Sequence, residues 1–557
     1  MIFARLLLNN SFPRKFGSLF QFYRDWWIVG LSSILNPRFS ARLPLSSILD
    51  PRFSIVLCLL WGILICACQR KPDPHVVVMA LETSPTTLDP RIGTSEVTSH
   101  VYELIFNSLI RRDQNFQFAP DLALSWENPD PLTYVFHLRR GVLFHNGKEL
   151  TSEDVKFTLD SLSKLTTPKK GSFSKLKEVT APDRYTVVFH LSSPYLEFLT
   201  NLVRPAIGIV PAGSGADFFQ HPVGTGPYRL IEFQQDRDVR LAAFDKYFEG
   251  QPALSEIYFR IIPDDTTRAL ELEKGSVDVA LNSISGDMLL RLKKQAHLQV
   301  DNAPGVRYQY LAFNLKHPIL SNVRVRQAIA YAIDRDSIIR YLYRGYARKA
   351  SSILPPFHWA YEPKVMQYRY DPALARQLLD QAGYSDPDGD GPRTRFALDY
   401  KASTTAEFVH QAEIIQENLR RVGINVQIHT LELATVLSDV RRGSFELYSL
   451  RWVGANLFTD IFNFVFHSKS APPAGANRGR YANPQVDALL DEANQTSDLG
   501  RRKEIFSQVQ KIVAEDLPYV SLWYPDNVVV YNRRLENVRI IPSGDYVFLK
   551  DVRIRPK

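Results

Sequence analysis

The sequence predicts a mixed α/β fold, in which short strands alternate with amphipathic helices. Several runs of about six residues are apolar or alternate between apolar and polar side chains, as strands do. Other segments place apolar residues at helical spacing behind residues that cap helices. The 557 residues are 45% hydrophobic and 23% charged, which is enough apolar material for two or three domains with real cores. This mixture excludes a pure β-barrel.

The strand predictions begin at residues 76–81, a continuous apolar run that reads as a buried strand and is followed by a turn at Ser84 and Pro85. Residues 132–138 and 185–191 are rich in Thr, Tyr, Val and Phe, which favour strands. Residues 424–430 alternate between apolar and polar side chains. The strands predicted at 132–138 and 185–191 lie on either side of a helix that is predicted to begin at Thr151. This order indicates a fold in which hairpins are mixed with helices.

The first predicted helix covers residues 97–112, where apolar residues recur at helical spacing. A second begins at Thr151, with a hydroxyl to cap it and acidic residues in its first turn. Asn322 is the predicted cap of a third helix, whose apolar stripe includes Val325 and Ile329. Further amphipathic helices are predicted at 373–382, at 406–422 (ended by Gly423) and at 501–514.

All three cysteines lie near the N-terminus, at Cys58, Cys66 and Cys68. The apolar run 55–67 is shorter than the roughly 20 residues that span a bilayer, and it matches the h-region of a secretory signal. Small Ala67 directly before Cys68 resembles the lipobox of bacterial lipoproteins. We therefore expect residues 1–67 to be an N-terminal extension with a lipoprotein signal peptide, and Cys68 to be the lipidation site. A signal anchor or an uncleaved apolar segment is the alternative.

Charge and cysteine content restrict the function further. Residues 1–67 hold seven Lys or Arg and two Asp or Glu, so the formal net charge of +8 falls to about +3 after cleavage at Cys68. The basic balance is therefore largely a property of the leader and gives no indication of nucleic-acid binding. Only one cysteine would remain, so no disulfide within the mature chain is possible.

The segment Arg140–Val155 is the most specific of several sequence blocks that stand out along the chain. The others include the Leu-Asp-Pro of residues 88–90 and the blocks 221–228, 244–248, 311–315, 323–335, 370–372 and 378–384. In type and order these blocks resemble the family 5 extracellular solute-binding proteins, the peptide, oligopeptide and nickel receptors of ABC importers.

The resemblance implies a two-lobed periplasmic-binding-protein-like fold (class II, cluster C type) with an extra subdomain in lobe I. By analogy we expect a linker at 68–75, lobe I at 76–314 with an insert at about 111–221, lobe II at 315–521, and a return to lobe I at 522–557. Two chain crossings, near Leu315 and Trp523, would act as the hinge. The expected protein is an exported, lipid-anchored monomer that holds a small peptide and delivers it to a permease in the inner membrane.

The family also indicates where the ligand binds. Peptide receptors place an Asp opposite the ligand amine in a segment resembling Trp-x-Gly-Asp, and the matching run here starts at Trp452 and has Ala455 at the Asp position. Asp460 is another acid nearby, although a structural role is the favoured interpretation for it. An oligopeptide or dipeptide remains the first expectation, and a blocked peptide, a nickel chelate, a sugar, or a sensor or chaperone role stay open. The candidate ligand-binding residues are Thr83, Ser84, Pro85, Arg451, Trp452, Val453, Gly454, Ala455, Asn456 and Asp460.

No catalytic or cofactor motif stands out, so we expect a receptor without cofactor or bound metal rather than an enzyme. The run from Asp386 to Gly391 resembles the start of an EF-hand loop, yet Ala397 occupies the position that needs a bidentate Glu. A polar turn is the favoured interpretation, with calcium binding as the alternative. The twelve histidines form no His-x-x-x-His pair.

Overall fold

The computed structural model describes residues 76–556, except for 114–116, 196–197, 204–205, 216, 390 and 497. These residues belong to one structural unit, Asp73–Lys557. The predicted lipidation site Cys68 and the linker 68–75 lie outside the described residues, as does Asp390 of the predicted polar turn.

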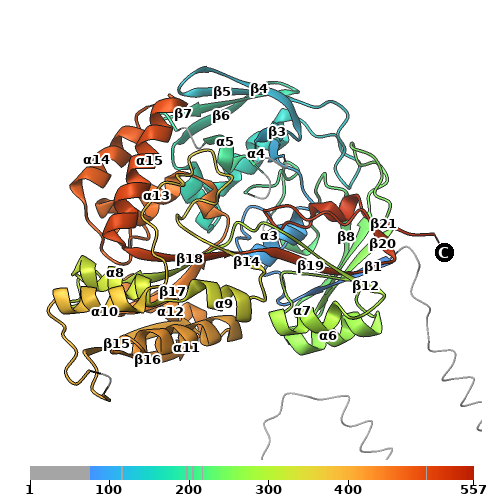
Figure 1. Cartoon of the computed structure of the whole chain (residues 1–557). Coiled ribbons are helices and arrows are strands. Elements are labelled where there is room, and N and C mark those ends of the chain that lie inside the picture. Colours follow the sequence, from blue (N-terminus) through green and yellow to red (C-terminus); the bar gives the residue numbers. More distant parts are fainter. Residues whose placement is uncertain are drawn as a thin grey trace, which may run out of the picture. The chain divides into compact units, whose positions relative to one another are not determined.

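A seven-stranded sheet forms the centre of lobe I, in the order β12-β19-β11-β1-β10-β9-β8 (Figure 1). Strand β1 runs parallel to both of its neighbours, β10 and β11. Its side chains alternate between two cores, Val77 and Met79 facing one and Ala80 the other, which explains why the run is continuously apolar. The strands are β1 Val76–Leu81, β8 Tyr228–Gln234, β9 Asp238–Ala243, β10 Glu256–Ile261, β11 Val279–Leu281, β12 Leu298–Ala303 and β19 Asn527–Asn532.

Helices cover both faces of this sheet. Helix α3 (Glu96–Tyr102) packs on one face, and helices α6 (Asp265–Lys274) and α7 (Gly286–Leu292) pack on the other. The chain ends in lobe I, where the short pair β20 (Leu535–Glu536) and β21 (Arg553–Ile554) adds Leu535 and Ile554 to the core that α3 shares.

Lobe II is built on a six-stranded sheet in the order β14-β18-β13-β17-β15-β16. One core joins this sheet to α8, α9, α10 and α11, and a second core on the other face joins it to α12, α13, α14 and α15. The strands are β13 Tyr308–Phe313, β14 Ala347–Lys349, β15 Phe396–Ser403, β16 Ile424–Leu431, β17 Leu447–Trp452 and β18 Tyr519–Pro525. The helices are α8 Val323–Ala332, α9 Arg335–Tyr341, α10 Pro372–Gln381, α11 Ala406–Arg420, α12 Leu433–Arg442, α13 Asp460–Phe466, α14 Pro484–Ala493 and α15 Leu499–Asp516.

A third body, the insert, interrupts lobe I. It has a four-stranded antiparallel sheet, β4-β5-β7-β6, and its own core, whose members run from Leu109 to Ile209, close to the expected range 111–221. Helix α4 (Ser152–Leu162) packs on this sheet, and Asp154 accepts hydrogen bonds from the main chain and hydroxyl of its capping residue Thr151. The remaining elements are β2 Ile110–Arg112, β3 Phe118–Pro120, β4 Ala123–Asp130, β5 Thr133–Leu138, β6 Leu176–Asp183, β7 Thr186–Leu191 and α5 Phe198–Asn201.

The chain passes between the lobes at 304–307, not near Leu315 as expected, and at Asp526, close to the expected Trp523. Strands β13 and β18 both pair within the lobe II sheet, whereas β12 and β19 pair in lobe I. The first expected boundary, at 314, is therefore several residues too late, because an apolar strand at 308–313 reads the same in either sheet. The second, at 522, is a few residues too early, because β18 continues to Pro525. At the crossings, a Cβ on Gly305 would lie 2.0 Å from the carbonyl oxygen of Pro525, so only glycine fits.

Most predicted elements are confirmed within one or two residues, including strands β1, β5, β7 and β16. The helix predicted over 97–112 is wrong beyond Tyr102, where α3 ends. The main-chain oxygens of Leu104 and Ile105 accept hydrogen bonds from Tyr228 and Gly226 instead. A Cβ on Gly224 would approach the Ile105 oxygen to 1.9 Å, which explains the glycine in this block.

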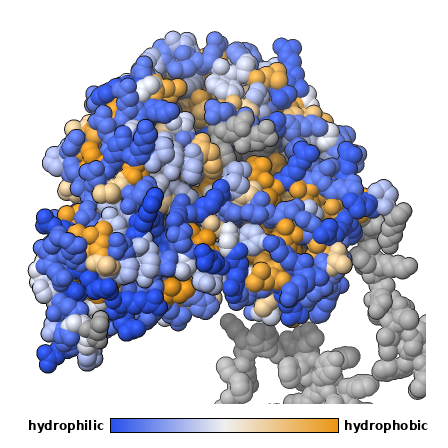
Figure 2. Space-filling view, viewed as in Figure 1, coloured by the Kyte–Doolittle hydropathy of each residue, from blue (hydrophilic) through white to orange (hydrophobic). Residues whose placement is uncertain are grey.

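Hydrophobic side chains appear as small patches among charged ones on the face shown in Figure 2, as on most folded proteins. Among the described helices, none is long and apolar enough to cross a bilayer.

Candidate functional site

A cavity of about 530 Å³ lies between lobe II and the insert. Helix α13 contributes Asp460 and Phe464 to its wall, and the insert contributes Tyr195 and Lys175. The Tyr195 hydroxyl donates a hydrogen bond to Asp460 Oδ2 over 3.3 Å, and the Lys175 ammonium lies 4.9 Å from the Tyr195 ring centre. Figure 1 shows α13–α15 beside the strands of the insert. Side chains from both bodies therefore enclose a space in the size range of small-molecule sites.

A second hollow, of about 620 Å³, lies along the edge strand β8 and includes His145, Phe219 and Ile231 in its wall. Every residue that lines it belongs to lobe I or its insert. Since lobe II contributes nothing to this hollow, closure of the two lobes cannot enclose a ligand there. The cavity at α13 is therefore the better candidate site.

A buried charge cluster occupies helix α3 and faces the crossing segment. His100 lies 3.5 Å from Glu103 and 3.8 Å from Glu96. Burial works against the charged imidazole, but Glu103 and Glu96 raise the pKa of His100 to about 10. Burial would likewise raise the pKa of Glu96, yet the hydrogen bond to His100 and the charges of Arg307 and Arg451 lower it to about 2. His100 and Glu96 are therefore both charged at neutral pH.

Arg451 connects this cluster electrostatically to lobe II. Its Nη1 lies 3.2 Å from Glu407 Oε2, at the start of α11. Burial lowers the pKa of Arg451, but Glu407 together with Glu96 and Glu82 of lobe I raises it above the ordinary value. Attraction between Arg451 and two lobe I carboxylates favours an arrangement in which the lobes are close.

Trp452 points to the opposite face of β17, as strand alternation requires. Its ring stacks on Tyr310 with 6.4 Å between centroids, and it meets Phe464 edge-on at 6.1 Å. The Arg478 guanidinium lies 5.4 Å from the Trp452 ring centre. Trp452 is partly exposed and stands directly behind Phe464, which lines the cavity. It is thus a wall residue that also belongs to the second core of lobe II.

The other predicted residues of this segment have distinct surroundings. Val453 is exposed, and Gly454 adopts a φ of +74° at the turn. Ala455 begins a short 3-10 helix, Ala455–Leu457. Asn456 is fully buried, and its side-chain amide donates to the main-chain oxygens of Val306 and Ile353. Asn456 therefore supports the crossing segment, and of this set Asp460 is the residue that lines the cavity.

The predicted residues in lobe I follow the carboxyl end of β1. Thr83 is exposed, Pro85 is buried, and the Ser84 hydroxyl accepts a hydrogen bond from the main-chain N–H of Asp236 over 3.1 Å. Neighbouring Glu82 influences the pKa of Arg451 in lobe II. The Glu82 carboxylate therefore interacts electrostatically with Arg451 of lobe II. The Ser84 side chain, in contrast, is hydrogen-bonded within lobe I.

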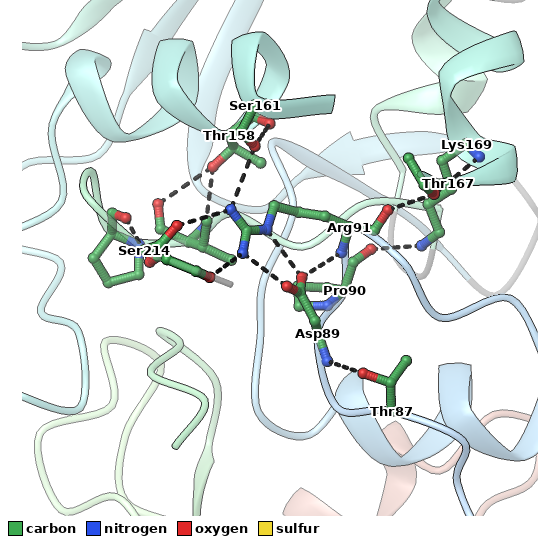
Figure 3. Close-up of polar contacts among 12 residues, drawn as sticks. Thr87, Asp89, Pro90, Arg91, Thr158, Ser161, Thr167, Lys169 and Ser214 are labelled. Atoms are coloured by element: carbon green, nitrogen blue, oxygen red, sulfur yellow. Dashed lines mark hydrogen bonds and ion pairs between the residues drawn. The ribbon is translucent and has the colours of Figure 1, made fainter. Parts of the chain in front are cut away.

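The Leu-Asp-Pro block forms a structural clamp (Figure 3). Asp89 accepts two hydrogen bonds from the Arg91 guanidinium, at 3.0 and 2.7 Å, and both side chains are 2% exposed. Arg91 also donates to Ser161 of α4, and Lys169 donates to the main-chain oxygen of Pro90 over 2.6 Å. This clamp, defined here by Asp89, Arg91 and Lys169, fastens the insert to the first loop of lobe I.

The described residues contain no group of three His, Cys, Asp or Glu side chains arranged to hold a metal ion. In the turn that resembles an EF-hand, Asp386 lies 3.6 Å from Arg395, and Asp388 accepts from the main-chain N–H of Arg393. Protein groups therefore contact both of these carboxylates.

Sequence reasoning missed several residues of the site, among them Tyr195, Glu96, Arg307 and Arg478. Their partners lie far away in the chain, so no short motif marks them. One signal was available: Glu96, His100 and Glu103 recur at helical spacing on a segment whose other residues are largely apolar.

Comparison with known proteins adds the family context. The model for bacterial extracellular solute-binding proteins, family 5 middle, matches residues 117–472. The dipeptide-binding protein of Escherichia coli K12 is 28% identical over 508 residues, covering 85% of this chain and 93% of that protein. The glutathione-binding protein GsiB of Pectobacterium atrosepticum is 30% identical over 485 residues, covering 85% and 93%.

A solved structure shows the same architecture. The oligopeptide-binding protein AppA of Bacillus subtilis, in complex with a nonapeptide, superimposes with a TM-score of 0.73 at 26% identity. The match covers 86% of this chain and 99% of that one. The two-lobed periplasmic-binding-protein-like fold predicted from the sequence is thereby confirmed.

Proposed function

The chain belongs to the family 5 bacterial extracellular solute-binding proteins, and on this premise we propose that it captures short peptides between its lobes and delivers them to an ABC permease. Relatives named for dipeptides, glutathione and oligopeptides support a peptide as the ligand. Members of this family act as receptors, so we expect binding and release without a chemical step.

The cavity shared by lobe II and the insert is the observation that carries this proposal. Lobe II and lobe I are joined by two single-chain crossings, at 304–307 and Asp526. Asp526 accepts hydrogen bonds from Asn302 of lobe I and from Arg348 of lobe II, so it ties both lobes at the crossing. A hinge of this kind lets the lobes part to admit a ligand and close over it. Ligand binding then shifts the population toward the closed form.

The wall of the cavity suits a peptide. Aromatic rings of Tyr195, Phe458 and Phe464 offer contact surface with little conformational cost. Asp460 lies in the same wall and supplies a negative charge for a ligand ammonium group, which the sequence lacks at Ala455. A charge-assisted bond of this kind is about twice as strong as a neutral one. We therefore assign the amine end of the ligand to Asp460.

The proposal also covers the location of the protein. We expect an exported monomer that is anchored through lipid on Cys68, on the periplasmic or outer side of the cell envelope. The short apolar run ending at Ala67 and the extracellular nature of the family support this assignment. A lipid anchor would keep the receptor at the membrane, where its effective concentration near a permease is higher.

Native mass spectrometry of the full chain, purified in mild detergent from its host, tests the ligand. We expect co-purified masses of peptides a few residues long, together with the added mass of acyl chains on Cys68. Calorimetric titration of ligand-free protein with dipeptides to pentapeptides should give saturable binding without product formation.

Binding of a nickel–histidine chelate or a sugar, with no response to any peptide, would overturn the peptide assignment and leave the receptor assignment in place. Hydrolysis of added peptides would contradict the receptor assignment itself. As a check on the amine site, Asp460→Asn should weaken the binding of free-amine peptides about tenfold and leave N-acetylated peptides unaffected.

A further inference from the structure

Lobe II also contacts lobe I at a second place, on the side of the hinge away from the cavity. This contact, called the seat here, joins the turn 342–346 of lobe II to Gly286 and Asp287 at the start of helix α7. Arg344 Nε donates to Asp287 Oδ1 over 2.9 Å. The Tyr346 ring packs against the lobe I core that α6 and α7 cover. The lobes are therefore packed together here as well as at the cavity.

The seat and the cavity lie on opposite faces of the lobe I sheet. The insert leaves lobe I next to Leu104 and Ile105, which belong to the core on the α3 face, whereas Tyr346 packs on the other core. The chain crosses between the lobes at 304–307 and Asp526. Figure 1 shows the insert above the crossing strands β18 and β19, with α7 and α9 below them. A rotation about the crossings that moves lobe II away from the insert therefore presses the seat together, as in a lever.

Gly286, the first residue of α7, has no room for a side chain in the seat. A Cβ at this position would lie 2.8 Å from Arg344 Cγ and 2.9 Å from the Leu342 oxygen, whereas carbon atoms in contact are normally about 3.5–4.0 Å apart. Gly286 does not have the positive φ that favours glycine, and glycine is less favourable than alanine in a helix. The close approach of lobe II therefore explains this glycine, and its own backbone does not.

The turn that approaches Gly286 is held firmly within lobe II. The main-chain N–H of Leu342 donates to the Ile338 oxygen over 2.8 Å, which joins the turn to helix α9. The main-chain N–H of Asp526 donates to the Tyr346 oxygen over 2.9 Å, which joins the turn to the crossing. The turn therefore moves together with lobe II and cannot be pushed aside without the loss of these bonds.

We propose that the seat sets how far the lobes open, and that Gly286 is the residue that leaves room for the open form. The inference rests on the proposed function in one respect, since it takes ligand capture to need an open and a closed form. A side chain at position 286 would collide with the turn more severely as the lobes part, so it would raise the free energy of the open form relative to the closed form. A protein whose binding-competent form is more populated binds its ligand more tightly.

Gly286→Ala tests the seat, because it adds only the Cβ and suits a helix. Small-angle X-ray scattering of the ligand-free, full-length variant should give a smaller radius of gyration than the unaltered protein has. Calorimetric titration with trialanine should show about threefold tighter binding. Gly286→Val adds more bulk at the same place and should enlarge both effects.

Gly500→Ala is the matched control, since Gly500 also lies in the first turn of a helix, α15. Its Cβ would approach Oδ1 of the capping residue Asp498 to 3.1 Å and meets no atom of lobe I among the described residues. Gly500→Ala should keep the radius of gyration and the affinity of the unaltered protein. Asp287→Asn weakens the ion pair of the seat and keeps its shape. Because this pair is largely exposed, the affinity should stay within about twofold.

Arg344→Ala is the opposite test, because it removes the Cγ that lies closest to Gly286 and so widens the seat. Alone, it should give a larger radius of gyration and weaker trialanine binding than Asp287→Asn, which disturbs the same ion pair but keeps the bulk. Combined with Gly286→Ala, it should return part of the gain in affinity. This variant also decides the matter if Gly286→Ala does not fold.

A ligand-free Gly286→Ala protein with an unchanged or larger radius of gyration would disprove the role of the seat. So would a trialanine affinity that is unchanged or weaker while the unaltered protein binds the peptide, and in both cases peptide capture stands. If the unaltered protein does not bind trialanine, capture of short peptides is contradicted, and the scattering comparison alone supports or disproves the seat. Thermal unfolding followed by circular dichroism shows whether each variant is folded.

Discussion

The clamp in lobe I and the corner in lobe II, defined by Arg478, Trp452, Tyr448 and Tyr519, both place an arginine among polar side chains, but they differ in their partners. In the clamp, Arg91 is 1% exposed and meets Asp89 through two hydrogen bonds. In the corner, Arg478 is partly exposed and is hydrogen-bonded to the hydroxyls of Tyr310 and Tyr448. The clamp is closed by its own carboxylate, whereas the acceptors in the corner are neutral hydroxyls.

The difference shows how a buried charge can be assigned a role. A cation with a full set of acceptors cannot accept a ligand without losing bonds that the fold needs. A cation with neutral acceptors leaves no carboxylate unpaired when it is removed. On this basis, a substitution in the clamp should change stability more than a substitution in the corner.

The largest effect is expected for Arg91→Met. This substitution leaves the Asp89 carboxylate buried without its cation, and breaking one side of such a pair costs about 3–5 kcal/mol of unfolding free energy. Urea unfolding followed by circular dichroism measures the loss. Peptide affinity of the folded fraction should stay unchanged, because the clamp does not line the cavity.

The exposed pair Lys156 and Asp160 is a matched control within helix α4, with 2.7 Å between the charged atoms. Because water screens this pair, Lys156→Met should cost about 0.5 kcal/mol or less. An equal loss in both variants would mean that burial does not distinguish the clamp.

A smaller, pH-dependent effect is expected at Lys169. Burial lowers the pKa of Lys169 from 10.5 to about 7, against the attraction of Asp89. Between these pH values the unfolded chain binds a proton that the folded protein has released, so stability rises with pH across this window. The contribution is at most about 1.4 kcal/mol per pH unit. Unfolding of Lys169→Met at pH 7 to 9 should show a flatter dependence than the unaltered protein.

Lys170 is the control, since it is exposed in the same 3-10 helix, Pro168–Phe173. Lys170→Met should keep the original slope. A Lys169→Met protein with an unchanged slope would show that the clamp tolerates the charged lysine.

The comparison also explains what could be predicted from the sequence. Elements with strong local patterns, such as the apolar strand 76–81 and the capped helix after Asn322, appear as expected. The helix predicted over 97–112 fails after Tyr102 because Leu104, Ile105 and Leu109 are apolar for a different reason, as part of a buried loop bonded to the 226–228 segment. Burial produces the same composition in a loop as in a helix, so the pattern cannot separate them.

The site was less predictable than the fold. Trp452 and Asp460 lie in a segment that family resemblance marks, and the structure places both at or beside the cavity. Tyr195 comes from the insert and lines the cavity, and Arg478 lies against the Trp452 ring; tertiary packing alone brings both to these places. A single sequence contains no pattern for such distant neighbours.

Trp452→Phe tests the indole N–H with little change in shape. Because this N–H has no partner among the described residues, its removal should cost no more than about 1.5 kcal/mol of stability, mostly through lost volume. Affinity for short peptides should fall about fivefold, because the Trp452 ring supports Phe464, which lines the cavity. Calorimetric titration with a dipeptide or tripeptide measures the loss. An unchanged affinity would assign Trp452 to the core of lobe II alone.

The smallest change in stability is expected for Arg478→Met, the counterpart of Arg91→Met. Both substitutions remove a guanidinium and keep an unbranched chain, but Arg478→Met leaves no described carboxylate without its ion pair. The free energy of unfolding should therefore stay within about 0.5 kcal/mol of the original value. Urea unfolding of the two variants side by side measures the contrast. A loss of about 3 kcal/mol or more at Arg478 would show that its aromatic contacts stabilise the fold as strongly as the clamp does, and the division between the two regions would fail.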